Sequence, residues 1–227
     1  MSEFKGFPKE TVDFFDRLKK NNTKQWFEVH RKDYDEYVKQ PAMDFVVFMG
    51  EKLRQIAPGI NAIPAVNKSL FRLNRDTRFS RDKSPYKTHL GIWFWEGRRK
   101  RMECPGFYFH LEDRRLMLGT GIHMFPGALL KLYRQAVVDG KNGPQLEKKI
   151  TAVAKKGYSI VGQHYKRVPR GFDASHKNAE YLKYNGLTAM IEGDLPEELF
   201  SKKIVGYAFT HFKNMSPLHD WLKNALI

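Results

Sequence analysis

The side chains best suited to chemistry lie in one charged stretch, FRLNRDTRFSRDKSPYKTHLGIWFW, which covers Phe71–Trp95. The segment 68–101 holds eleven lysines and arginines against three acids, which leaves +8 of the chain's net charge of +15. A charge concentrated in this way produces a local field that attracts anions. The stretch therefore predicts a binding pocket for a small anionic ligand, and we expect that ligand to carry phosphate.

Two aspartates interrupt the basic residues and indicate an ordered site rather than a polybasic tail. A carboxylate that pairs with one side of a guanidinium leaves the other N–H groups of the arginine aimed elsewhere. We expect Asp76 and Asp82 to orient the bases in this way. The predicted ligand-binding residues are Arg72, Arg75, Asp76, Arg78, Asp82, Lys83 and Lys87. The alternative is a solvated charged loop whose surface ion pairs contribute little stability.

Strand periodicity places several histidines on one face of a sheet, because successive side chains of a strand point to opposite sides. The predicted covered face carries Phe71, Leu73, Ile92, Phe94, Phe107, Phe109, Leu116 and Leu118. The opposite face then carries Arg72, Asn74, His89, Trp93, Tyr108, His110 and His123, with Gly119 and Gly121 leaving room for something to approach the backbone. The candidates for proton transfer are His89, His110, His123 and Tyr86.

Three histidines on one sheet face also suggest a metal site, because imidazole is a common zinc ligand. No HExxH, CxxC or short histidine spacing supports that hypothesis, so no metal site is predicted. Half-buried structural histidines are an equal alternative. The chain has no GxGxxG, Walker or GxSxG motif either, so the sequence identifies no cofactor and leaves enzymatic activity open.

A nucleic-acid-binding module is the main alternative function. Basic side chains would follow the phosphates, and Trp93, Trp95 or Tyr108 would stack on bases. Acids within such a track would repel the backbone, so we expect nucleic acid to bind weakly at most. A third class is a structural or partner-binding protein whose charge serves solubility.

The elements that position these residues follow from hydrophobic periodicity. Helices are expected at about 8–20, from Thr23 through Val38, at 41–56, from Pro126 and at 144–156, and again after a capping box at Asp194 and from Ser216–Pro217. Strands are expected at about 68–74, 89–96, 106–112 and 115–123, with a hairpin at 112–114 and a short strand at 187–192. This order predicts a single α+β domain over 1–227, with a mainly antiparallel sheet flanked by N-terminal and C-terminal helices.

Composition favours a folded, basic, cytoplasmic protein. The chain has 227 residues, of which 41% are hydrophobic, enough for a substantial core. Its single cysteine, Cys104, cannot form a disulfide within the chain, which fits a reducing compartment. The N-terminus lacks the apolar segment of a signal peptide, and no run of apolar residues is long enough to span a bilayer, so no membrane association is expected.

The stretches RDTRFSRDKSPYKTHLGIWF, PGFYFHLE, LGTGIHMFP and VPRGFDASHKNAEYLKYNGL resemble an uncharacterised family, domain of unknown function 2461. The resemblance covers nearly the whole chain, and the pattern RDxRFSxDKxPYK is long and specific. It implies a single-domain, mostly bacterial cytosolic protein of α+β type and implies no activity. The family signature falls on the same charged stretch, from Arg75 to Lys87.

Overall fold

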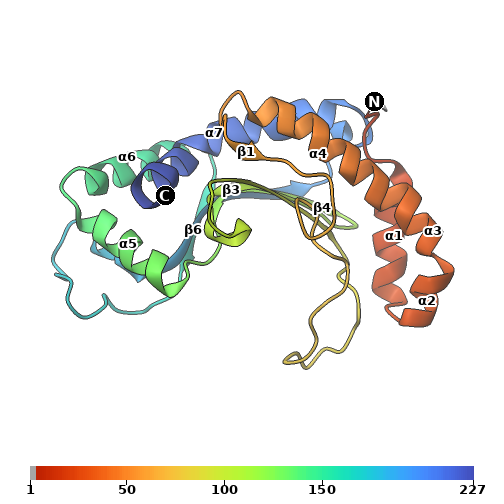
Figure 1. Cartoon of the computed structure of the whole chain (residues 1–227), viewed down its shortest axis with the longest axis horizontal. Coiled ribbons are helices and arrows are strands. Elements are labelled where there is room, and N and C mark those ends of the chain that lie inside the picture. Colours follow the sequence, from red (N-terminus) through yellow and green to blue (C-terminus); the bar gives the residue numbers. More distant parts are fainter. Residues whose placement is uncertain (1–3) are drawn as a thin grey trace. The chain divides into compact units, whose positions relative to one another are not determined.

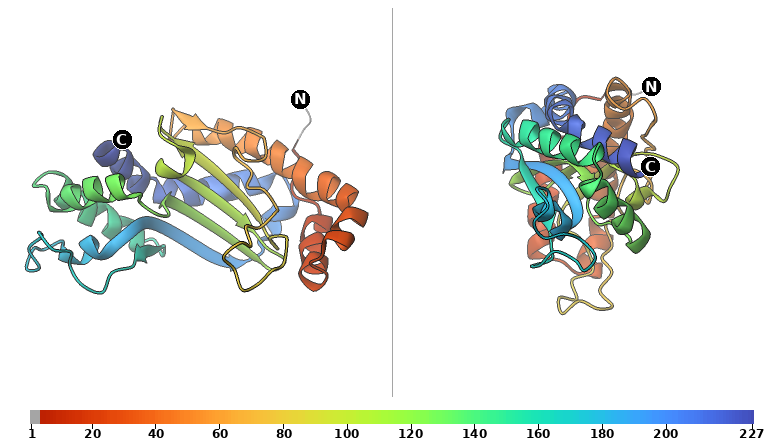
Figure 2. Two further views of the ribbon diagram at one scale, coloured as in Figure 1. Left: turned by 60° about the horizontal axis from the view of Figure 1, so that its bottom comes forward. Right: turned by 90° about the vertical axis from the view of Figure 1, so that its left-hand side faces the viewer.

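The computed structural model describes residues 4–227 and has the predicted α+β fold. Its six strands form one antiparallel sheet in the order β1-β2-β3-β4-β6-β5, in which β2, β3 and β4 lie side by side (Figure 2). The strands are β1 (Ile60–Asn61), β2 (Leu90–Glu96), β3 (Gly106–Leu111), β4 (Arg115–Ile122), β5 (Ser159–Gln163) and β6 (Tyr184–Asp194).

The central strands agree with the sequence prediction, whereas the strand expected at 68–74 was wrong. That segment makes isolated bridges, of Leu70 with Val66 and Ile92 and of Asn74 with Tyr86. It follows the edge of β2 briefly and then pairs with its own continuation, so no regular ladder forms. Strand β5 was not predicted, because its side chains are exposed or half-exposed and show no apolar alternation.

The helical segments are α1 (Lys9–Lys20), α2 (Lys24–Val29), α3 (Arg31–Asp33), the π-helical turn η1 (Tyr34–Lys39), α4 (Gln40–Leu53), α5 (Gly127–Val138), α6 (Asn142–Ala154) and α7 (Lys203–Leu226), with short 3-10 turns at η2 (Arg101–Glu103), η3 (Ala179–Lys183) and η4 (Glu197–Phe200). The side chain of Thr23 caps α2 by accepting a hydrogen bond from the Trp26 N–H. The helix predicted after Thr23 is interrupted at His30, where α2 ends.

Two predictions near the C-terminus were wrong. The expected capping box at Asp194 does not form, because β6 continues through this residue and only the turn η4 follows. The last helix begins at Lys203, and Pro217 lies inside it. A proline in a helix leaves an earlier carbonyl without its usual N–H donor. Here the Ser216 hydroxyl donates to the carbonyl of Lys213 at 3.0 Å, which helps the helix to continue.

The chain divides into two compact units. The first runs up to Phe94 and includes Tyr108–Leu118 and Glu192–Thr210, and the second contains Trp95–Phe107, Gly119–Ile191 and His211–Ile227. Strands β2, β3, β4 and β6 contribute residues to both units. The prediction of a single domain stays a prediction.

The first unit has an aromatic core on one face of β2 and β3. Phe109 stacks on Phe7 with ring centroids 5.5 Å apart, and the ring of Phe45 from α4 lies 4.6 Å from it. Helix α4 runs alongside these strands (Figure 1). Seven of the eight residues predicted for the covered face are buried, and Phe71 is the exception. Its half-buried ring contacts Tyr108 instead, so Phe71 lies on the opposite face.

In the second unit, the ring of Tyr133 from α5 lies 6.2 Å from that of Trp221 from α7, and the ring of Phe107 lies 5.3 Å from that of Phe212, which also belongs to α7. The indole N–H of Trp221 donates to the Asn142 carbonyl at 2.9 Å, which joins α7 to α6. Gly121 has a φ of +145°, and a Cβ placed there would lie 2.1 Å from the Leu187 carbonyl oxygen. The group that approaches this glycine is therefore the backbone of strand β6. No helix within residues 4–227 combines the length and apolar character that crossing a membrane requires.

Candidate functional site

The charged stretch forms a loop that leaves the sheet and returns to it (yellow in Figure 1). Its base is closed by backbone hydrogen bonds from the Arg75 N–H to the Pro85 carbonyl at 2.9 Å and from the Lys87 N–H to the Leu73 carbonyl at 2.8 Å. These bonds fix residues 75 to 85 as a closed loop, here called the charged loop.

Asn22, which follows α1, anchors this base from a distant part of the sequence. Its side-chain amide donates to the Tyr86 carbonyl at 2.9 Å, and the Tyr86 N–H donates to Asn22 Oδ1 at 3.1 Å. The Asn22 side-chain amide thus makes with the Tyr86 backbone the same pair of N–H···O=C hydrogen bonds that a residue of a neighbouring strand would make. The ring of Tyr86 packs on Phe27 with centroids 4.4 Å apart. The sequence analysis did not single out Asn22, so this role was missed.

Asp82 organises the inner part of the charged loop. It accepts hydrogen bonds from the Ser84 hydroxyl at 2.6 Å and from the Ser84 N–H at 2.9 Å, and it forms an ion pair with Arg75. These contacts hold the pKa of the Asp82 carboxyl well below its usual range, chiefly through Ser84 and then through Arg75. Asp82, itself held by Ser84, therefore orients Arg75.

Asp76 and Arg78 form a second, outward pair. Asp76 accepts hydrogen bonds from Arg78 Nη2 at 2.7 Å and from Nε at 3.0 Å, and this fork lowers the pKa of Asp76 to about 2. The Arg78 side chain is 77% exposed. Lys83 is also used within the loop, because its ammonium donates to the Thr77 carbonyl at 2.9 Å.

A pocket of about 400 Å³ lies beside the charged loop in the first unit. It is lined by Lys19, Asn22, Arg75, Asp82, Ser84, Tyr86, Lys87, Thr88 and His89. Five residues predicted from the sequence thus meet at one place: Arg75, Asp82, Tyr86, Lys87 and His89. The lining described for this pocket does not include Arg72, Asp76, Arg78, Lys83, His110 or His123.

Next to His89, a row of hydrogen-bonded polar side chains lies along one face of β3. Tyr108, His110 and Glu112 alternate along the chain, so they project from the same side. The Tyr108 hydroxyl lies 2.9 Å from His110 Nδ1, and His110 Nε2 lies 2.9 Å from Glu112 Oε1. The rings of His89 and His110 stack with centroids 4.2 Å apart. The structure therefore brings together two of the three predicted histidines.

Burial controls the charge of His89 and Tyr108. It lowers the pKa of His89 to about 4, with smaller contributions from His110 and Lys87, so that the imidazole is neutral near pH 7. It also raises the pKa of Tyr108 to about 12 and keeps the phenol protonated. Burial raises the pKa of Tyr86 as well.

Gly91 explains how Tyr108 reaches across strand β2. A Cβ at Gly91 would lie 2.9 Å from the Tyr108 hydroxyl and 3.1 Å from the ring of Phe71. The absence of a side chain lets the phenol lie over β2 and still contact His110.

His123 does not join this row, and Glu112 was missed by the sequence analysis. His123 follows the end of β4, is exposed and belongs to the second unit. Glu112 was assigned only to the hairpin turn. Its signal was present in the period-two series Tyr108, His110 and Glu112, which continues one position beyond the last residue of β3.

The aromatic side chains proposed for stacking on bases are covered. Trp93 is 6% exposed and Trp95 is 8% exposed. Tyr108 is half-buried and contacts Trp93 and Phe71. In the charged loop, Phe79 is instead 95% exposed, with the Arg78 guanidinium 5.8 Å from its ring.

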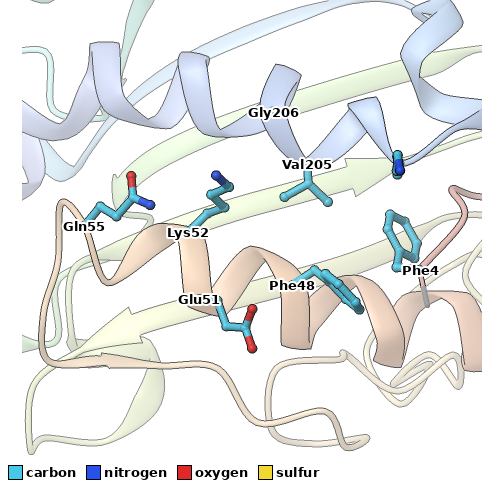
Figure 3. A pocket seen from close by; sticks show the side chains of 8 residues that line it. Phe4, Phe48, Glu51, Lys52, Gln55, Val205 and Gly206 are labelled. Carbon is cyan, nitrogen blue, oxygen red and sulfur yellow. The ribbon is translucent and has the colours of Figure 1, made fainter. Parts of the chain in front are cut away.

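Another pocket in the first unit, of about 500 Å³, contains none of the predicted site residues. Helix α4 supplies Phe48, Glu51 and Lys52 to it, and the beginning of α7 supplies Val205 and Gly206 on the other side (Figure 3). Its mixed apolar and charged lining lacks the concentration of basic groups found beside the charged loop.

Comparison with known protein families gives one match. The model described as "Conserved hypothetical protein (DUF2461)" matches residues 10–221 of the chain. A comparison of the chain with curated proteins found no match. The match covers the charged loop, the polar row on β3 and most of both units.

Proposed function

This chain belongs to the DUF2461 family of conserved hypothetical proteins, and we propose that it binds a small, phosphate-bearing anion in the pocket beside the charged loop. The observation that carries the proposal is the composition of that pocket. Three cationic side chains, Lys19, Arg75 and Lys87, line it with a single acid, Asp82.

Arg75 supplies the directional contact. A guanidinium has five N–H donors in a planar fork, and the pair with Asp82 uses only part of that fork. Since Asp82 is also held by Ser84, the carboxylate fixes the plane of the guanidinium. An arginine oriented in this way loses less conformational entropy when it binds a phosphate than a mobile surface arginine does.

Hydroxyl groups complete the lining. Thr88 can donate its hydroxyl to a phosphate oxygen, whereas the Ser84 hydroxyl already donates to Asp82, and His89 adds a ring nitrogen at the wall. A volume of about 400 Å³ accommodates a small ligand, because ligand pockets usually span about 300–1,000 Å³. The polar lining favours an anionic group over an apolar one.

The nucleic-acid alternative has less support, because the buried Trp93 and Trp95 cannot stack on bases. Binding through several phosphates would also weaken steeply with salt, with a slope of about −0.7 per phosphate on a single strand in a double-logarithmic plot. A single anion in a partly enclosed pocket would show a shallower dependence.

Titration calorimetry with inorganic phosphate at constant ionic strength tests the proposal. The informative variant is Arg75→Ala, and its matched control is Arg78→Ala, which removes an arginine of the same loop that does not line the pocket. Losing charge-assisted hydrogen bonds of about 1.5–3 kcal/mol should weaken binding about 10- to 100-fold. The control should bind as the parent protein does.

Lys87→Gln with Lys83→Gln as its control provides a second pair, should Arg75→Ala prove unstable. The proposal fails if the parent protein shows no saturable phosphate binding. It also fails if the pocket variants and their controls lose affinity equally, since that result would indicate a diffuse effect of net charge.

A further inference from the structure

We propose that His89, His110 and Glu112 form a binding site for a divalent transition-metal ion, with Zn²⁺ as the preferred ion. One potential ligand atom from each of these residues lies within 4.8 Å of the other two. This inference goes beyond the anion pocket and does not depend on it, because the three side chains can bind an ion in the absence of phosphate.

The donor set suits zinc. Two imidazoles and one carboxylate form a combination found in zinc enzymes, where three protein ligands leave a coordination position open. Imidazole nitrogen also favours Zn²⁺ and its first-row neighbours over Mg²⁺ and Ca²⁺, which prefer oxygen ligands. The cluster therefore predicts selectivity for a transition metal.

The distances allow an ion after a small rearrangement. Zinc ligands at about 2.0–2.1 Å from a tetrahedral ion lie roughly 3.3 Å from each other. His110 Nε2 and Glu112 Oε1, at 2.9 Å, are already close to that spacing. His89 has to tilt out of its stack on His110, where the ring planes make an angle of 27°. Within residues 4–227, no hydrogen bond holds the ring nitrogens of His89, so this tilt breaks none.

Tyr108 prepares His110 for this role. Metal-bound histidines usually have their second ring nitrogen held by a hydrogen-bond partner, which fixes the tautomer and the ring orientation. With an ion on Nε2, the proton of His110 resides on Nδ1 and is donated to the Tyr108 oxygen, 2.9 Å away. Gly91 leaves the space in which that hydroxyl lies.

The backbone supports the three ligands from two neighbouring strands. His110 lies within β3, Glu112 follows the end of that strand, and His89 immediately precedes β2. His110 is positioned by a regular strand, and each of the other two ligands lies one residue from a strand end, so both are close to rigid backbone. Because His89 also lines the anion pocket, an ion bound to its ring would be accessible to an anion there.

The test is metal titration of the full chain after treatment with a chelator. Zn²⁺ affinity is measured by competition with a chromophoric chelator, and Co²⁺ reports coordination through its visible absorption. We expect one ion per chain and a Co²⁺ spectrum typical of nitrogen and oxygen ligands. Tyr108→Phe should weaken binding about 10- to 100-fold, and His110→Ala should weaken it at least as much.

Glu112→Gln is the second ligand variant. Since this side chain is only partly buried, the substitution should leave the fold intact. The control is His123→Ala, which removes an exposed histidine outside the cluster. Absence of stoichiometric binding would refute the metal site, as would equal loss of affinity in the control. Phosphate titration of the chelator-treated protein tests the anion pocket separately, so either assignment can fail alone.

Discussion

Asn22→Ala should loosen the base of the charged loop. The substitution removes the side-chain amide that donates to the Tyr86 carbonyl at 2.9 Å and accepts from the Tyr86 N–H at 3.1 Å. Asn22 itself lies outside the loop, 64 residues from Tyr86 in the sequence. The effect should therefore be measurable at Tyr86, at a distance along the chain from the mutated residue.

The expected magnitude follows from two neutral hydrogen bonds. Each contributes about 0.5–1.5 kcal/mol to the free energy of unfolding, which gives about 1–3 kcal/mol in total. In a chain of this length, 1 kcal/mol lowers the melting temperature by about 2–4 °C. Water can replace part of the lost bonding, because the site is only partly buried.

Two measurements check this prediction. Thermal unfolding gives the loss of global stability, and amide hydrogen exchange gives the local opening at Tyr86. Asn22→Asp is the matched variant, because it retains the acceptor for the Tyr86 N–H but places a carboxylate oxygen against the Tyr86 carbonyl. It should be at least as destabilising as alanine.

An unchanged melting temperature together with unchanged exchange at Tyr86 would refute the anchoring role. Asn21→Ala serves as the neighbouring control, because the Asn21 side-chain amide donates to the Arg17 carbonyl at the end of α1 and not to the charged loop. If the two alanine variants behaved alike, the result would indicate a general effect on the end of that helix.

Three further predictions concern the core. Phe109→Ala should cost about 3–5 kcal/mol in unfolding free energy, measured by chemical denaturation, because a fully buried ring is lost. Gly121→Ala should prevent stable folding, because the added Cβ would overlap the Leu187 carbonyl of β6. Gly127→Ala is the control and should be tolerated, because the space around Gly127 is open. Circular dichroism distinguishes a folded variant from an unfolded one. Burial raises the pKa of Tyr133 well above its ordinary value of 10.0. The protonated phenol of Tyr133 stabilises the folded state fully below the pKa that Tyr133 has in the unfolded chain, and this stabilisation is lost as the pH rises above that value. Tyr133→Phe should therefore reduce the fall in stability above about pH 10, measured by alkaline denaturation followed through tyrosinate absorbance. An equal alkaline loss in both proteins would contradict that assignment.

The sequence could indicate the charged loop, beside which the pocket lies, because the concentration of charge is visible there. The partners of each charge could not all be predicted. Asp76 and Arg78 lie two residues apart and pair locally, so Arg78 points outward although it has the same charge as Arg75. Arg75 instead pairs with Asp82, across the charged loop, and this pairing places it at the pocket.

Which side chains share a strand face can be read from the residue order, because that property depends on the alternation of consecutive residues. Tyr108 and His110 were placed on one face correctly for this reason. Which of the predicted histidines meet depends on the tertiary fold, because the pairing and register of neighbouring strands are set by contacts between distant segments. Those contacts bring His89 onto His110 and assign His123 to the other unit. The same long-range folding brings Asn22 to Tyr86, a pairing of two ordinary residues that carries no local signal.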